Sequence, residues 1–445
     1  MTDPFSIPAF SFPKGFEFGS ATAGHQIEGN NINSNNYFEE LKEREKNPEY
    51  PLSGLACNSY ELFEEDSKIL SEFGHKVYRM SIEWSRIEPS EGTFLESEVD
   101  HYKKVFESLK ERNIKICLTL NHGTVPQWFA EKGWFHKREN ITFFERYVEY
   151  IVPKICRYVD YWIVLNEPNG STDTAWFPFK FNAVLAHARA NSIIKKYSNA
   201  PVSTSIGYVQ QYAKRQNDRF DRMVQDFNDI VMHEYFFHAI RTGELVVPYH
   251  DAIYDPEIKN SCDFWAINSY TRRLVDARSK TLTSDRYHHE KLKVLPDSNM
   301  GSCMFAECLI HNTTRLMDKP VYITECGYPA EDDDFSLVYL VEYLSAVSEA
   351  ISMGVDIRGF FYWSLIDNYE WGSYSPKFGL FKVDDNFKRI PKKVAYLYKD
   401  IIENGGYTPD MLTKYLKELP RVKYGAEKTK LNVKKNENVF QGGDS

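Results

Sequence analysis

Eight short apolar segments recur along the chain, and stretches with helical spacing separate most of them. The candidate strands are residues 16–23, 76–83, 114–120, 161–166, 201–208, 263–270, 320–325 and 359–365. Runs such as Val321-Tyr322-Ile323 are apolar without alternation, which is typical of strands in a parallel sheet that is covered on both faces. Strands that alternate with helices in this way indicate the α/β class.

Helical patterns occupy residues 59–73, 99–112, 141–159, 182–197 and 337–353, and the first of them ends at Gly74, a typical C-terminal cap. Gly15, Gly19 and Gly24 lack the spacing of a dinucleotide-binding loop, which argues against an open doubly wound sheet. We therefore predict a (β/α)8 TIM barrel with long βα loops, formed as a single domain by residues 1–405. Residues 406–445 are expected to form an extension, with a short helix at 411–419 and then a polar, Lys-rich tail.

Composition limits the partners and the compartment. The formal net charge of −9 argues against nucleic acid, which binds basic surfaces. No run of 18 apolar residues predicts a transmembrane helix, and the first 15 residues lack the basic start and apolar stretch of a secretory signal. The seven cysteines are scattered, without a Cys-x-x-Cys pair. We expect a cytoplasmic protein with reduced thiols and with neither nucleic-acid nor membrane partners; the sequence does not indicate an oligomeric state.

Two carboxylates stand out because each follows an apolar strand. Glu167 comes after the run 161–165, and Glu325 comes after the run 321–323. Burying a carboxylate is costly unless it is paired or used in a reaction. Each could form an ordinary salt bridge with a Lys or Arg, but catalytic groups of β/α barrels lie at these strand ends. Other polar and aromatic residues occupy or follow the same strand ends: Gln26, Arg79, His122, Asn166, Asn268, Tyr270, Trp363, Glu370 and Trp371.

A pair of carboxylates without a metal-ligand cluster is typical of glycosyl transfer. One carboxyl group protonates the leaving oxygen, and the other attacks or stabilises the anomeric carbon. The sequence contains no His-x-x-x-His motif, no Cys/His cluster and no Gly-x-Ser-x-Gly elbow. We therefore expect neither a metal nor a cofactor.

Seven sequence blocks, in collinear order over about residues 12–404, resemble glycoside hydrolase family 1. They are GFEFGSATAGHQIEG at 15–29, YRMSIEWSRIEP at 78–89, residues 120–128 with His122, LNEP at 165–168, DFWAINSY at 263–270, ITECG at 323–327 and FYWSLIDNYEWGSYSPKFGLFKV at 361–383. The resemblance implies a β-glucosidase-like retaining β-glycosidase that acts on a small-molecule β-glycoside or an oligosaccharide, most often a β-glucoside, with β-galactoside and β-fucoside also open.

The resemblance also implies a role for each site residue. Glu167 is expected to be the catalytic acid/base and Glu325 the nucleophile. Arg79, Asn268 and Tyr270 are expected to support the nucleophile. The expected substrate-binding residues are Gln26, His122, Asn166, Tyr270, Trp363, Glu370, Trp371 and Phe378.

The chain departs from the family pattern at three places. Cys326 replaces the usual Asn after the nucleophile, Gly123 stands where many members have an aromatic residue, and the stretch 169–180 is short. The space beside Gly123 is filled by another aromatic residue, such as Trp128 or Trp176, by water, or, if the pocket is enlarged, by a bulkier sugar substituent. Two other functions remain open: a transglycosylase that uses the same glycosyl-enzyme intermediate, and a non-catalytic carbohydrate-binding relative, which would be expected to lose one glutamate.

The segment after strand eight predicts a non-phosphorylated substrate. Family members that hydrolyse 6-phospho-sugars replace the Glu-Trp pair and hold the phosphate with Ser, Lys and Tyr a few residues further on. This chain keeps Glu370-Trp371, and it has Pro376 and Phe378 at the positions of that Lys and that Tyr.

Overall fold

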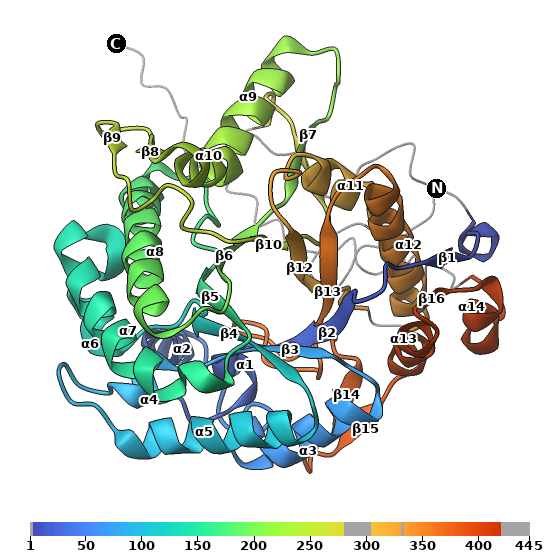
Figure 1. Ribbon diagram of the computed structural model, residues 1–445, viewed down its shortest axis with the longest axis horizontal. Helices are drawn as coiled ribbons and strands as arrows, with labels where there is room; N and C mark the ends of the chain where they lie inside the picture. Colours follow the sequence, from blue (N-terminus) through green and yellow to red (C-terminus); the bar gives the residue numbers. More distant parts are fainter. Residues whose placement is uncertain (1–2, 280–303, 331–332, 420–445) are drawn as a thin grey trace, which may run out of the picture.

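The computed structural model describes residues 3–279, 304–330 and 333–419, and its centre is a closed barrel of eight parallel strands (Figure 1). The barrel strands are β2 Glu17–Ala21, β3 Val77–Ser81, β4 Lys115–Asn121, β5 Tyr161–Asn166, β6 Val202–Gly207, β10 Trp265–Asn268, β12 Val321–Cys326 and β13 Ile357–Trp363. Each strand falls within or overlaps one predicted segment. Neighbours in sequence pair with each other, and β13 pairs with β2 to close the barrel. The predicted (β/α)8 fold is confirmed.

Long helices surround the strands in Figure 1. They are α3 Ser59–Glu72, α5 Glu96–Glu111, α7 Ile141–Ile155, α8 Phe177–Tyr197, α10 Tyr235–Thr242, α11 Glu307–Thr314, α12 Asp333–Ser352 and α13 Lys393–Asn404. Helix α7 is typical, because Phe144, Val148, Ile151 and Ile155 form one buried stripe at helical spacing. Helix α3 ends as predicted: Gly74 adopts a φ of +79° and donates its N–H to Ser71 O.

Three helices begin earlier than the sequence predicted, and the first of them, α5, begins at Glu96 rather than at residue 99. Helix α8 begins at Phe177 rather than at residue 182, because Pro178 is well suited to the first helical turn and the neighbouring phenylalanines are buried. Helix α12 begins at Asp333 rather than at residue 337. By length and composition α12 could cross a membrane, but it is mostly buried inside the protein, as a core helix would be.

A second, smaller sheet prolongs the barrel on one side of its rim. Strand β7 Gln210–Ala213 follows β6, strand β11 Arg272–Val275 follows β10, and the two pair in parallel. Helix α9 Arg219–Asp229 packs against this pair and continues through a π-helical turn, Ile230–Glu234, into α10. The sequence patterns predicted neither of these strands.

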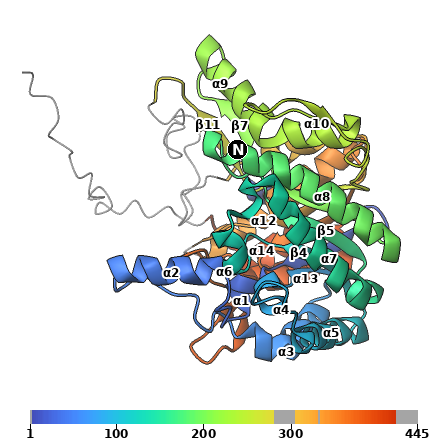
Figure 2. The same cartoon turned by 90° about the vertical axis from the view of Figure 1, so that its left-hand side faces the viewer.

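Shorter elements lie in the connecting loops. They are α1 Gly24–Ile27, α2 Asn35–Lys46, α4 Trp84–Ile87, α6 Gln127–Glu131, β8 Glu244–Leu245, β9 Ile253–Tyr254, β14 Phe381–Val383 and β15 Arg389–Pro391. Helix α2 belongs to the long loop after β2 and projects from the body of the protein in Figure 2. The predicted long βα loops therefore include folded segments.

The first part of the expected C-terminal extension packs against the barrel domain. Strand β16 Gly406–Tyr407 pairs with β1 Phe10–Ser11, and α14 Pro409–Tyr415 follows it. Tyr407, Leu412 and Leu416 are buried in the main hydrophobic core. The predicted helix at 411–419 therefore lies at Pro409–Tyr415, and residues up to Leu416 share the core of the barrel. The Lys-rich tail from residue 420 lies outside the described residues.

Six of the seven cysteines lie in the described residues, and five of these six are buried; Cys303 lies outside the described residues. Burial raises the pKa of the Cys57 thiol, which suits a structural role. The cytoplasmic location remains a prediction.

Candidate active site

A cavity of about 450 Å³ opens at the C-terminal ends of the barrel strands. Ten of the twelve predicted site residues line it: Gln26, His122, Asn166, Glu167, Tyr270, Glu325, Trp363, Glu370, Trp371 and Phe378. The other two, Arg79 and Asn268, are buried beside it and contact Glu325 and Glu167 respectively. Residues from six separate strands or strand ends thus meet at one place, as expected for this fold.

Two strong hydrogen bonds hold the carboxylate of Glu325. Arg79 Nη1 donates to Oε1 at 2.6 Å, and the Tyr270 hydroxyl donates to Oε2 at 2.6 Å. Burial raises the pKa of Glu325, while the charge of Arg79 and the Tyr270 hydroxyl oppose that rise. Both contacts favour an ionised carboxylate whose two oxygens are fixed in place. The salt bridge considered as the ordinary alternative is present here, but Glu325 also lines the cavity.

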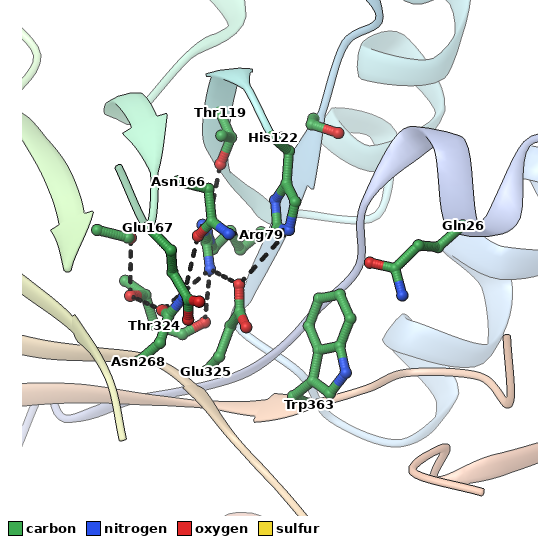
Figure 3. A network of polar contacts seen from close by, with 12 residues as sticks. Gln26, Arg79, Thr119, His122, Asn166, Glu167, Asn268, Thr324, Glu325 and Trp363 are labelled. Carbon is green, nitrogen blue, oxygen red and sulfur yellow. Dashed lines mark hydrogen bonds and ion pairs between the residues drawn. The ribbon is translucent and has the colours of Figure 1, made fainter. Parts of the chain in front are cut away.

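Arg79 on β3 connects Glu325 to the neighbouring strands, and Figure 3 shows it between Asn166 and Glu325. Its Nη2 donates to Asn166 Oδ1 at 2.6 Å and its Nε donates to Thr119 Oγ1 at 3.3 Å. The side chain is fully buried. Because the planar guanidinium group makes several directed contacts at once, it fixes Asn166 and Glu325 relative to each other.

Glu167 has a different environment. Asn268 Nδ2 donates to its Oε1 at 2.8 Å, and within the described ranges no Lys, Arg or His forms an ion pair with it. Burial, reinforced by the negative charge of Glu325, raises the pKa of Glu167 to about 7. Gly207 on β6 makes room for this carboxyl group, because a Cβ there would lie 2.9 Å from Glu167 Cδ. Glu167 is thus protonated at a pH where an exposed glutamate is ionised.

Asn268 on β10 is oriented by its own contacts. Thr324 Oγ1 donates to Asn268 Oδ1 at 2.7 Å, so the amide NH2 group points to Glu167 and to Asn166 Oδ1. Ser205 Oγ lies 2.9 Å from Thr324 Oγ1 and extends the network to β6. Sequence reasoning missed Thr324 and Ser205, because neither side chain reaches the cavity.

A second group of polar side chains lies on the other side of Glu325, where Figure 3 shows Trp363 and Gln26. Trp363 Nε1 donates to Glu370 Oε1 at 3.1 Å, and Gln26 Nε2 donates to Glu370 Oε2 at 3.1 Å. Burial raises the pKa of Glu370 to about 7. His122 Nε2 lies 3.1 Å from Asn166 Nδ2, and burial lowers the pKa of His122 well below its usual value, so the imidazole is neutral. This end of the cavity offers hydrogen-bond donors and acceptors beside the Trp363 ring.

The model for glycosyl hydrolase family 1 matches residues 9–407 of this chain. The chain belongs to glycosyl hydrolase family 1. A β-galactosidase from Saccharolobus solfataricus is 29% identical over 93% of this chain and 99% of its own length. Beta-glucosidase A from Thermotoga maritima is 29% identical over 89% of this chain and 98% of its own length. The predicted enzyme class, a glycoside hydrolase, is confirmed.

Solved structures of family 1 enzymes share the fold. A β-glycosidase from Pyrococcus horikoshii superposes with a TM-score of 0.80 at 29% identity, covering 92% of this chain and 98% of that one. A β-glucosidase from Thermotoga maritima in complex with glucoimidazole gives a TM-score of 0.79 at 26% identity, covering 89% and 100%.

Gly123 of this glycosyl hydrolase lies against Trp371. The aromatic residue beside Gly123 is therefore neither Trp128 nor Trp176, the two candidates that the sequence offered. A Cβ at position 123 would lie 3.5 Å from the Trp371 ring, which also stacks on His25 with ring centroids 5.9 Å apart. Trp128 and Trp176 pack elsewhere, against Phe143 and Trp134 respectively. Gly123 has a φ of +82°, so any larger residue there would be strained. Trp371 remains 42% exposed and lines the cavity mouth.

Cys326, the other notable departure, points away from the cavity. It is fully buried, and its Sγ lies 3.2 Å from the Tyr339 hydroxyl. The hydroxyls of Tyr339 and Tyr343 donate to the main-chain oxygen of Tyr270 at 3.3 and 2.5 Å. The residue after the nucleophile therefore belongs to the support of Tyr270 and removes no group from the cavity.

Several cavity residues were not predicted from the sequence: Val209, Thr271, Arg272, Arg273, Gly327, Tyr328 and Pro329. They follow the ends of β6, β10 and β12. The basic pair Arg272-Arg273, two residues after Tyr270, was a signal that the sequence offered. Within the described ranges, no group of His, Cys, Asp and Glu side chains could hold a metal ion.

Proposed function

We propose that this family 1 enzyme is a retaining β-glycosidase that hydrolyses non-phosphorylated β-glycosides, β-glucosides above all. The observation that carries the proposal is a pair of buried carboxyl groups that face one cavity in unlike environments. Glu325 accepts hydrogen bonds from Arg79 and Tyr270. The pKa of Glu167 is raised to about 7, so this carboxyl group keeps its proton at a weakly acidic pH. A double displacement needs this difference, because one group must attack while the other donates a proton.

In the first step, Glu325 forms a bond to the anomeric carbon while the bond to the leaving oxygen breaks. The proton of Glu167 moves to that oxygen. In the second step, Glu167 takes a proton from water, the water oxygen bonds to the anomeric carbon, and the bond to Glu325 breaks. Glycosylation removes the negative charge of Glu325, which had raised the pKa of Glu167, so Glu167 becomes a better base when a base is needed. Both inversions at carbon together retain the configuration.

Product stereochemistry tests this mechanism directly. We expect proton NMR of a fresh reaction with 4-nitrophenyl β-glucoside to show the β-anomer of glucose first, with the α-anomer appearing later by mutarotation. If the α-anomer forms first, the enzyme inverts and the roles given to the two glutamates are wrong. Adding methanol tests the transglycosylase alternative, since methyl β-glucoside would then exceed free glucose as product.

The pH profile is expected to carry the signature of Glu167. We expect kcat/KM to fall as pH rises through about 7, because the proton that Glu167 donates is lost there. On the acid side, protonation of Glu325 is expected to reduce activity. Glu342 on α12 also has a pKa raised by burial to about 7 but does not line the cavity. The fall of kcat/KM above pH 7 should vanish in Glu167→Gln and persist in Glu342→Gln. If it persists in both variants, the titrating group would be Glu370 instead.

Glu370 is also the basis for expecting a non-phosphorylated sugar. Its carboxyl group lies in the cavity, and Phe378 beside it carries no hydrogen-bond donor. Above pH 7, where Glu370 is ionised, a phosphate beside it would place like charges together at a cost of several kcal/mol. In that pH range we therefore expect kcat/KM for 4-nitrophenyl β-glucoside to exceed that for its 6-phosphate at least about 100-fold. Assays of the two substrates under the same conditions measure this ratio. Faster cleavage of the 6-phosphate would overturn the expectation.

A further inference from the structure

One cation in the cavity has no part in the mechanism described above. Arg272, the first residue of β11, lines the cavity and is only 6% exposed. Its guanidinium group lies 3.8 Å from the ring centroid of Phe305 and 4.4 Å from that of Tyr212. In the part of the chain that the structure describes, its side chain forms neither a hydrogen bond nor an ion pair, and its Nε is enclosed without an acceptor.

The other deeply buried arginines of the barrel have carboxylate partners. Arg79 pairs with Glu325 at 2.6 Å, and Arg389 pairs with Asp66 at 2.7 Å. Burying a charge is costly unless an opposite charge and hydrogen bonds compensate for the lost water. The faces of Phe305 and Tyr212 stabilise the Arg272 cation, but they leave its N–H donors unused. Among the described residues, Arg272 is thus a preorganised guanidinium group without an anionic partner.

Strand order places this cation away from the groups that face the sugar. Between the catalytic strands β12 and β5, one arc of the barrel runs through β13, β2, β3 and β4, and the other runs through β10 and β6. The first arc supplies Gln26, His122, Trp363 and Glu370, whereas Arg272 follows β10 on the second arc. Val209, which follows β6, and Arg273, the next residue of β11, also line the cavity.

We propose that Arg272 binds a carboxylate on the leaving group, so that the preferred substrates are β-glycosides with an acidic aglycone. This inference rests on the proposed function, because it assigns the leaving group to the side of the cavity that holds Glu167. Guanidinium and carboxylate groups match each other in a bidentate geometry, and the charge of Arg273 adds to the attraction. A carboxylate on the sugar itself would instead face Glu370.

Two glucosides that differ only in charge test the proposal: 4-carboxyphenyl and 4-carbamoylphenyl β-D-glucoside. For each enzyme the ratio of their kcat/KM values is measured, and the ratios are compared between enzymes, which cancels the difference in leaving-group chemistry. We expect Arg272→Gln to lower the carboxylate-to-amide ratio about 10- to 100-fold, the range for hydrogen bonds to a charged group. Arg272→Lys keeps the charge but loses the planar guanidinium group, so its carboxylate-to-amide ratio should lie between those of the wild type and Arg272→Gln.

Arg358→Gln is the matched control. Arg358 lies near the beginning of β13, at the opposite end of the barrel, and is exposed beside Asp356, so the ratio should not change. An unchanged ratio in Arg272→Gln would overturn the proposal. So would hydrolysis of 4-nitrophenyl β-glucuronide that exceeds hydrolysis of the glucoside and depends on Arg272, because the anion would then belong to the sugar.

A binding experiment separates failure of the subsite from failure of the proposed function. Calorimetry measures the affinity of 4-hydroxybenzoate and of 4-hydroxybenzamide for the wild type and for Arg272→Gln, without any turnover. We expect the wild type to prefer the carboxylate and the variant to lose that preference. If the wild type prefers the carboxylate but hydrolyses no aryl glucoside, the proposed β-glycosidase function is refuted and the anion site stands. If the wild type binds the two compounds with equal affinity, the anion site is refuted.

Discussion

Glu325→Gly is expected to abolish hydrolysis, with a fall in kcat on the order of 10⁶-fold, as found when a covalent nucleophile is removed from a hydrolase. The variant keeps the acid, Glu167, but leaves no group that can bond to the anomeric carbon. Azide or formate can enter the vacated space and attack from the same side as the missing carboxylate. With an activated aryl β-glucoside, we therefore expect partial recovery of turnover and an α-glucosyl product, which NMR identifies.

Glu325→Gln is the matched control for this experiment. The amide remains within reach of Arg79 and Tyr270 and occupies the space of the carboxylate, so activity should be lost without rescue by azide. Circular dichroism should be recorded for both variants, because removing one partner of a buried ion pair costs about 3–5 kcal/mol. Near-normal activity in Glu325→Gly would end the assignment of the nucleophile.

Glu167→Ala is expected to separate substrates by their leaving groups. Alkyl glucosides need a proton on the departing oxygen, so kcat/KM should fall by roughly 10²–10⁴-fold, the usual contribution of a general acid. A 2,4-dinitrophenyl glucoside leaves without that proton, so its first step should be little affected, and added azide should give a β-glucosyl azide. The measurement is a plot of log kcat/KM against the pKa of the leaving group.

The slope of that plot decides the role of Glu167. The variant should show a much steeper dependence on leaving-group pKa than the wild type, because the wild-type acid compensates for poor leaving groups. Glu342→Gln, which removes another carboxyl group with a raised pKa outside the cavity lining, should retain the wild-type slope. Equal losses across the whole series in Glu167→Ala would show that the residue supports the fold or binding instead.

Much of this protein can be predicted from its sequence because barrel strands are buried on both faces. Several of these strands contain continuous apolar runs, and this makes them visible as segments like Val321–Ile323. A carboxylate that directly follows such a run is conspicuous for the same reason, which is how Glu167 and Glu325 were found. Local rules were enough for Gly74 as well, since the left-handed backbone that ends α3 favours glycine.

Features that depend on residues distant in sequence needed the tertiary structure. The pairing of β7 with β11 joins segments about 60 residues apart, and these short strands are mostly buried although each begins with two polar residues, so neither has a distinctive pattern by itself. Trp371 reaches Gly123 across almost 250 residues, so nothing local could identify it as the ring that fills this space. The start of α8 was missed because a run of phenylalanines around Pro178 does not show helical periodicity.

The amino-acid sequence by itself determined the family, the barrel and the two glutamates, because burial and strand-end position impose their patterns residue by residue. The tertiary structure decided how the groups of the site differ. Only the contacts of Arg79 and Tyr270 with Glu325, and of Asn268 with Glu167, give two chemically identical carboxyl groups unlike environments. Only the fold shows that Arg272 is a buried residue of the cavity lining with no carboxylate partner among the residues that the structure describes. Protonation and charge pairing depend on neighbours in space, which no local pattern records.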